Sequence, residues 1–248
     1  MKRCKILFLL LFALFPFSLM ASERESIYNA YIFNDMESWK RIIDRMHTIP
    51  DKTVEQELDL LNFEYGYIGW CMGNKKTSLA KIYMDRVEVR IASLRKRDIK
   101  PALLYAYESA CLGYRVGLNK FKAPVLGRKS VTAAEKSVKL DPNNAFGYVQ
   151  LGNIDYYRPA LFGGSKREAI KYYLIAEKLY LSKMKSGEVE GKDWNVLALW
   201  VQIAQAYDAL DEVKRADGYY KKILAKEPNF KWVKDNLYAK FKQKHNMS

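Results

Sequence analysis

The feature that most constrains the fold of this chain is an apolar pattern with helical spacing near its C-terminus. A first set of apolar residues recurs at i, i+3, i+4 and i+7, and so lies on one helical face: Trp200, Ile203, Ala204 and Tyr207. After a polar turn, a second set recurs at i, i+4, i+7 and i+8: Ala216, Tyr220, Ile223 and Leu224. The chain nowhere sustains strand-like alternation, and it contains no Asn-Gly dipeptide of the kind that closes β-hairpins. The sequence therefore predicts an all-α protein.

The same residues resemble the tetratricopeptide repeat, a unit of about 34 residues with the pattern W-x2-L-G-x2-Y…A-x3-F…P. The run that begins at Trp200 and ends at Pro228 follows every spacing of that pattern. The two strongest copies of the repeat span residues 145–181 and 197–230. The resemblance implies a right-handed superhelical solenoid of antiparallel helix pairs, in which stacked repeats share one continuous core.

Weaker copies extend the resemblance over most of the chain. Helix pairs are expected within residues 27–47, 53–94 and 103–140, and residues 231–243 have the apolar spacing of a terminal capping helix. Residues 23–248 are therefore expected to form one helical repeat domain of about five helix pairs.

The first 22 residues have the three-part layout of a secretory signal peptide. Met1–Lys5 is basic, residues 6–20 carry no charge, and the small residues Ala21 and Ser22 follow. The apolar run is short for a membrane-spanning helix, which needs about 20 residues. We therefore expect a cleaved signal and a periplasmic or secreted protein; an uncleaved N-terminal anchor is the alternative.

The formal net charge of +14 at first suggests a nucleic-acid partner. Three of the basic residues belong to the expected signal peptide, and an exported protein is not expected to meet nucleic acid. Residues 214–248 contain ten basic and three acidic side chains, so the excess charge is concentrated in the last helices. These helices could dock on an anionic membrane or an envelope polymer, or they could form a solubilising cap.

No catalytic, metal-binding or phosphate-binding motif is present in the sequence. Its three cysteines and two histidines are too far apart for a zinc site. We therefore expect no enzyme activity, no metal and no cofactor.

Cys71 and Cys111 occupy similar settings 40 residues apart. Because equivalent helices of neighbouring repeats lie roughly 8–10 Å apart, free buried thiols are favoured over a disulfide, which needs Cα atoms within about 7 Å.

The family resemblance also implies where a partner would bind, because the first helix of each repeat lines the concave surface. The chain contains 18 tyrosines, several of them in doublets such as Tyr156-Tyr157, and rings of this kind suit peptide binding or sugar stacking. The positions that match the groove of the family are Phe146, Val149, Asn153, Tyr156, Tyr157, Val201, Gln205 and Asp208.

The favoured function is a non-catalytic scaffold that binds a protein or peptide through this concave groove. The alternative is a ligand- or glycan-binding accessory subunit of an envelope transport or assembly system. The loop Gly163-Gly164-Ser165 bears on this choice, because a helix start after two glycines can hold an anion. The same residues also suit a tight turn with a serine N-cap, which is the simpler interpretation.

Overall fold

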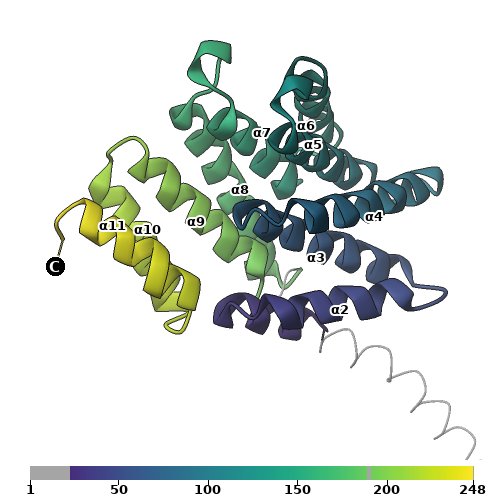
Figure 1. The fold of residues 1–248 in the computed structure, drawn as a ribbon, viewed down its shortest axis with the longest axis horizontal. Helices are drawn as coiled ribbons and strands as arrows, with labels where there is room; N and C mark the ends of the chain where they lie inside the picture. The colour runs from purple at the N-terminus through teal and green to yellow at the C-terminus, as the bar shows by residue number, and fades with distance from the viewer. Residues whose placement is uncertain (1–22, 189–190, 248) are drawn as a thin grey trace, which may run out of the picture.

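The computed structural model describes residues 23–188 and 191–247, and in these ranges the chain is helical and forms no strand (Figure 1). The all-α prediction is confirmed, whereas the expected signal peptide at residues 1–22 lies outside the described residues. The α-helices after a first helical segment, residues 23–33, are α2 (Met36–Thr48), α3 (Val54–Gly73), α4 (Thr77–Lys96), α5 (Pro101–Leu118), α6 (Arg128–Leu140), α7 (Ala145–Tyr157), α8 (Lys166–Ser186), α9 (Trp194–Asp208), α10 (Val213–Lys226) and α11 (Tyr238–Lys244). Short 3-10 or π-helical turns are η1 (Lys120–Lys122), η2 (Ala123–Gly127), η3 (Ala160–Phe162) and η4 (Trp232–Leu237).

Consecutive helices pack in pairs, α3 on α4, α5 on α6, α7 on α8 and α9 on α10. Helix α5 also packs against α3 and α7, so the first helices of these three pairs lie next to one another (Figure 1). Because each of these pairs reverses the chain, α3, α5 and α7 run in the same sense. Their C-terminal ends, and the loops that follow them, therefore gather at one end of the molecule.

Several helix boundaries follow from local chemistry. Thr53 and Gln56 form a capping box at the start of α3, in which each side chain satisfies a free backbone N–H of the other residue. Pro101 starts α5, where its missing N–H leaves no hydrogen bond unmade. Gly187 ends α8 with a φ of 79°, a left-handed conformation that favours glycine.

A close approach between two helices explains one glycine of the repeat pattern. Gly152 on α7 lies against the ring of Tyr173 on α8, and a Cβ atom at Gly152 would lie only 2.3 Å from that ring. A side chain at this position would therefore force α7 and α8 apart. The tyrosine ring fills the space that the missing side chain leaves.

The two ends of the described chain meet. The ring of Tyr31 lies 4.8 Å from that of Phe230, which follows α10, and 5.8 Å from that of Trp194 at the start of α9. Lys192 adds an ion pair of 2.9 Å to Glu25. The N-terminal helical segment therefore contacts the C-terminal helices, as the purple and green ribbons show (Figure 1).

Both cysteines within the described residues are buried and free, as expected from the sequence. The helices that the structure describes include none with the length and apolar character needed to cross a bilayer.

Candidate functional site

Three of the residues expected to line the groove do not reach the surface. Phe146, Val149 and Val201 are buried in the hydrophobic core. The ring of Phe146 lies 4.9 Å from that of Tyr65 and 4.6 Å from that of Tyr107. Because the first helices of the pairs lie close together, their facing apolar side chains pack on one another and leave no open groove at these positions.

Helix α9 supplies two other expected residues, which lie near its C-terminal end. Gln205 is half-buried, and Asp208 accepts hydrogen bonds from Lys244 and His245, each at 2.7 Å. Burial by itself would raise the pKa of Asp208, but the bonds from Lys244 and His245 outweigh it and hold the pKa below its ordinary value. Asp208 therefore fastens the C-terminal helix α11 to α9.

The remaining expected residues, Asn153, Tyr156 and Tyr157, come together with two tyrosines that sequence reasoning did not select. Tyr65 projects from α3 and Tyr114 from the last turns of α5, and their rings stack with centroids 5.8 Å apart. The set forms the tyrosine cluster, at the end of the molecule where α3, α5 and α7 terminate: Tyr65, Tyr114, Tyr156 and Tyr157.

The tyrosines of the cluster differ in exposure. Tyr157 is 71% exposed, so its ring is open to solvent, whereas Tyr65 is only 9% exposed. Desolvation is the chief cause of the raised pKa of Tyr157. Desolvation also raises the pKa of Tyr65, Tyr114 and Tyr156. The phenols stay protonated at neutral pH, so they can donate hydrogen bonds and stack.

A buried polar atom beside the cluster is only weakly satisfied. Gln150 is 3% exposed, and its Nε2 makes no hydrogen bond of ordinary length within the described residues, although the amide lies near the Tyr65 hydroxyl and lowers the pKa of that phenol. Its Oε1 accepts a long bond of 3.4 Å from Asn153, whose own Oδ1 accepts from Tyr173 at 2.8 Å. Burying an amide donor without a partner costs about 1–3 kcal/mol. Gln150 is therefore a weakly satisfied donor buried behind the tyrosine cluster.

Lys166 places a positively charged group beside the tyrosine cluster. Nζ of Lys166 lies 3.8 Å above the ring of Tyr156 and also donates to the backbone oxygen of Tyr156. Desolvation lowers the pKa of Lys166. The site thus combines aromatic faces with one amide donor and one ammonium group.

The glycine loop after α7 is a structural turn. The N–H groups of Gly163, Gly164 and Ser165 donate to the backbone oxygens of Ala160, Pro159 and Asp155. The Ser165 side chain accepts from the N–H of Glu168, as an N-cap does. Because these backbone donors are already used, the simpler interpretation of the loop holds and the loop offers no anion site.

Metal and acid–base chemistry find no support in the described part of the chain. It contains no group of three or more His, Cys, Asp or Glu side chains that could hold a metal ion. His47 lies at the end of α2 beside Arg90 and Glu64, and burial is the main cause of its lowered pKa. His245 bonds to Asp208, so neither histidine belongs to the tyrosine cluster.

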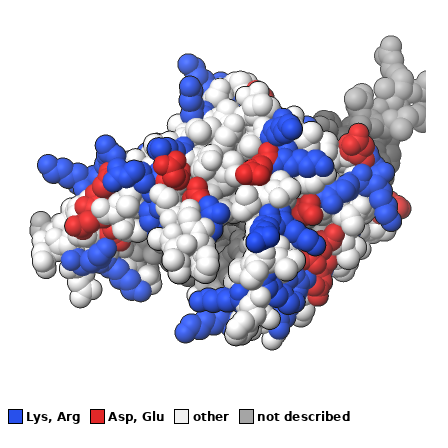
Figure 2. Space-filling model, turned by 90° about the horizontal axis from the view of Figure 1, so that it is seen from above, with Lys and Arg blue, Asp and Glu red and all other residues white. Residues whose placement is uncertain are grey.

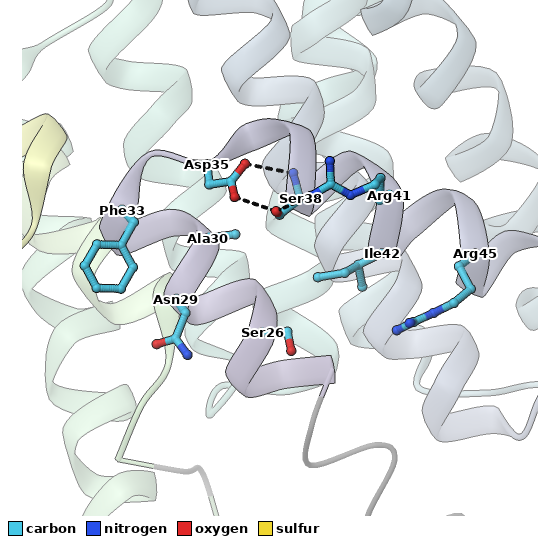
Figure 3. Close-up of a pocket in the computed structure, with 9 residues that line it drawn as sticks. All are labelled: Ser26, Asn29, Ala30, Phe33, Asp35, Ser38, Arg41, Ile42 and Arg45. Carbon is cyan, nitrogen blue, oxygen red and sulfur yellow. Dashed lines mark hydrogen bonds between the residues drawn. The ribbon is translucent and has the colours of Figure 1, made fainter.

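A shallow hollow of about 620 Å³ lies between residues 23–33 and α2 (Figure 3). Several of its polar groups already bind one another or a neighbouring residue. Asp35 accepts from the backbone N–H and the hydroxyl of Ser38, Arg41 donates to the same hydroxyl at 2.6 Å, and Arg45 pairs with Glu23. The tyrosine cluster, with its weakly satisfied donor, is the stronger candidate.

No protein-family model matches this chain, and no curated protein is similar to it in sequence. Among solved structures, the fold is similar to that of the HusA haemophore from Porphyromonas gingivalis, with a TM-score of 0.55 and 13% sequence identity. The match covers 75% of this chain and 94% of the haemophore. The chain is thus similar in helical architecture to an entire haemophore.

Proposed function

We propose that this protein is an exported, non-catalytic binding protein that holds a small planar ligand against the tyrosine cluster. The Nε2 of Gln150 carries the proposal: its only described partner is a weak contact with Tyr65, and a buried donor of this kind is stabilised when a ligand supplies a better acceptor. The aromatic faces of Tyr114 and Tyr157 suit an apolar ring system. Lys166 would pair with an anionic edge of the ligand.

The helix pairs α3–α4, α5–α6, α7–α8 and α9–α10 are, in this proposal, tetratricopeptide-type repeats. The spacing at Trp200 to Pro228 and the contact of Gly152 with Tyr173 support that assignment. Export by a cleaved signal at residues 1–22 is supported by the basic, apolar and small-residue layout of that segment. A ligand-binding role is preferred to a peptide scaffold because Phe146, Val149 and Val201 are buried and interrupt an open groove.

Haem is the first ligand to test, because the structural neighbour is a haemophore and haem is planar with carboxylate edges. The site lacks a histidine, and the raised pKa values disfavour tyrosinate ligation of iron. Binding would therefore rest on stacking and hydrogen bonds. Haem and metal-free protoporphyrin should bind with similar affinity, as absorbance and tryptophan-fluorescence titrations would measure.

The sharpest variant is Gln150→Leu. Removal of the donor should weaken protoporphyrin binding about three- to tenfold, while the free protein should be as stable as the wild type or more stable. A purely structural glutamine would give the opposite pattern, with lower stability and unchanged affinity.

A second pair of variants tests the stacking surface. Tyr157→Ala should weaken binding of both porphyrins about two- to tenfold. Tyr172→Ala, which removes a half-exposed ring on α8 outside the cluster, should leave binding unchanged. If neither porphyrin binds, or if both tyrosine variants behave alike, the assignment of the tyrosine cluster to a planar ligand is wrong.

A further inference from the structure

Two loops project from the end of the molecule where α5 and α7 terminate (Figure 1). Loop A, residues 119–127, connects α5 to α6, and loop B, residues 158–165, connects α7 to α8. Because α5 packs against α7 and runs in the same sense, both loops lie on the same side of the helix stack.

Both loops carry large apolar side chains at their tips. Phe121 in loop A is 97% exposed and Leu161 in loop B is 89% exposed; Val125 and Phe162 are also largely open to solvent. Single exposed apolar residues are common on soluble proteins, but paired apolar tips on neighbouring loops mark an interaction surface.

The backbone holds these tips outward. The side chain of Asn119 accepts from the N–H of Phe121 at 3.1 Å. Gly164 packs so closely on the backbone oxygen of Arg158 that a Cβ atom would lie 1.8 Å from it, and the Arg158 side chain donates to the Gly163 oxygen at 3.2 Å. The apolar tips are therefore built into defined turns.

The charged residues within the two loops are all basic. No acidic residue occurs between Glu108 and Glu135, or between Asp155 and Glu168. The basic residues of the loops and of the first turns of α6 and α8 that form no ion pair with any described residue are exposed: Lys120, Lys122, Arg128, Lys129 and Arg167. Figure 2, which looks onto this end, shows uncharged surface flanked by Lys and Arg side chains, with some Asp and Glu side chains among them.

We propose that loops A and B dock the protein on an anionic lipid bilayer. The apolar tips enter the boundary between headgroups and acyl chains, and the unpaired cations contact lipid phosphates. Apolar tips within loops whose charged residues are all basic complement a bilayer, which offers hydrocarbon beneath a layer of negative charge. The tyrosine cluster lies at the same end, so docking would bring the proposed ligand site close to the membrane.

The basic C-terminal helices are less suited to this role, because their described residues include no large exposed apolar side chain, and four of their ten basic residues are already paired. Arg215 pairs with Glu212, Lys221 with Asp217, Lys222 with Glu177 and Lys244 with Asp208. The sequence places most of the excess charge there, but the structure leaves the free cations of loops A and B beside apolar tips.

The experiment measures the fluorescence of a label placed in loop B. Membrane binding through the N-terminal apolar run therefore does not by itself change the signal. In the full chain with Cys4→Ser, a single cysteine is introduced at Leu161→Cys, or at Val89→Cys on α4 as a control, and labelled with an environment-sensitive fluorophore. Cys71 and Cys111 are buried and stay unlabelled. Vesicles of phosphatidylcholine with phosphatidylglycerol should raise the fluorescence at position 161 several-fold and leave position 89 unchanged.

Charge variants then test the electrostatic half of the proposal. Lys122→Ser and Lys129→Ser should each weaken vesicle binding about fivefold, whereas Lys178→Ser on α8 should not. Moderate salt should reverse the fluorescence change. No response at position 161 at low salt, or equal responses at positions 161 and 89, would overturn bilayer docking and leave a protein partner as the occupant of this surface.

Discussion

The hydroxyl of Tyr28 donates a hydrogen bond of 2.5 Å to Oε1 of Glu227, a residue 199 positions further along the chain. This bond fastens the N-terminal helical segment, residues 23–33, to the turn that follows α10. Burial and the Glu227 carboxylate both raise the pKa of Tyr28, so the phenol remains a donor at all physiological pH values. The N-terminal helical segment and the turn after α10 are thus joined by a direct hydrogen bond.

Tyr28→Phe should lower the free energy of unfolding by about 1–2 kcal/mol, because the Glu227 carboxylate loses a donor in a partly buried setting. Urea unfolding followed by circular dichroism measures the loss. Tyr172→Phe removes a hydroxyl that forms no hydrogen bond within the described residues, and it serves as the control. Equal stability of the two variants would show that the chain ends do not support each other.

A pair of glycine-to-alanine changes should act in opposite directions. Gly152→Ala places a methyl group against Tyr173 and should destabilise the protein by about 1–3 kcal/mol through overpacking. Gly218→Ala, in the interior of α10 with no atom near the added methyl, should stabilise it by about 0.5–1 kcal/mol. Thermal unfolding of both variants checks the contrast, and a destabilising Gly218→Ala would contradict it.

The ion pair at the C-terminal cap should give a pH-dependent contribution to stability. Because the pKa of Asp208 is held below its ordinary value, its contribution is present above the unfolded pKa of 3.8 and is lost as pH falls through the lower folded pKa. Asp208→Asn should therefore cost about 0.5–1 kcal/mol at neutral pH.

The cost of Asp208→Asn should vanish in strong acid, where the wild-type carboxyl is protonated as well. Unfolding curves of the wild type and the variant at several pH values measure this convergence. A difference in stability that stayed constant down to acid pH would show that the Asn side chain disturbs packing instead.

The two buried thiols should be inert until the protein unfolds. Desolvation raises the pKa of Cys71 to about 11 and raises that of Cys111 further, so little reactive thiolate forms at pH 8. Alkylation by iodoacetamide followed by mass spectrometry should modify Cys71 and Cys111 in denaturant only. The exposed cysteine of Leu161→Cys is the positive control, and rapid labelling of Cys71 in the native protein would contradict the burial.

Repeat position alone did not identify the residues of the candidate site, because the direction of each side chain also matters. The family pattern selected Phe146 and Val149, which point into the core, together with Tyr156 and Tyr157, which join the tyrosine cluster. Tyr65 and Tyr114 were missed because they lie in pairs where the repeat pattern is weak. Gln150 was missed because its burial with only a weak partner is a property of its surroundings.

The sequence by itself determined that the chain is helical, because apolar residues at a spacing near 3.6 define one buried face on each helix. It also placed the small residues, such as Gly152 and Ala204, where paired helices approach closely. Only the tertiary structure decided which distant helices contact one another, and hence that Tyr28 reaches Glu227 and that Phe146, Val149 and Val201 are buried. Local spacing acts over a few turns of helix, whereas these contacts result from packing between helices that are far apart in the chain.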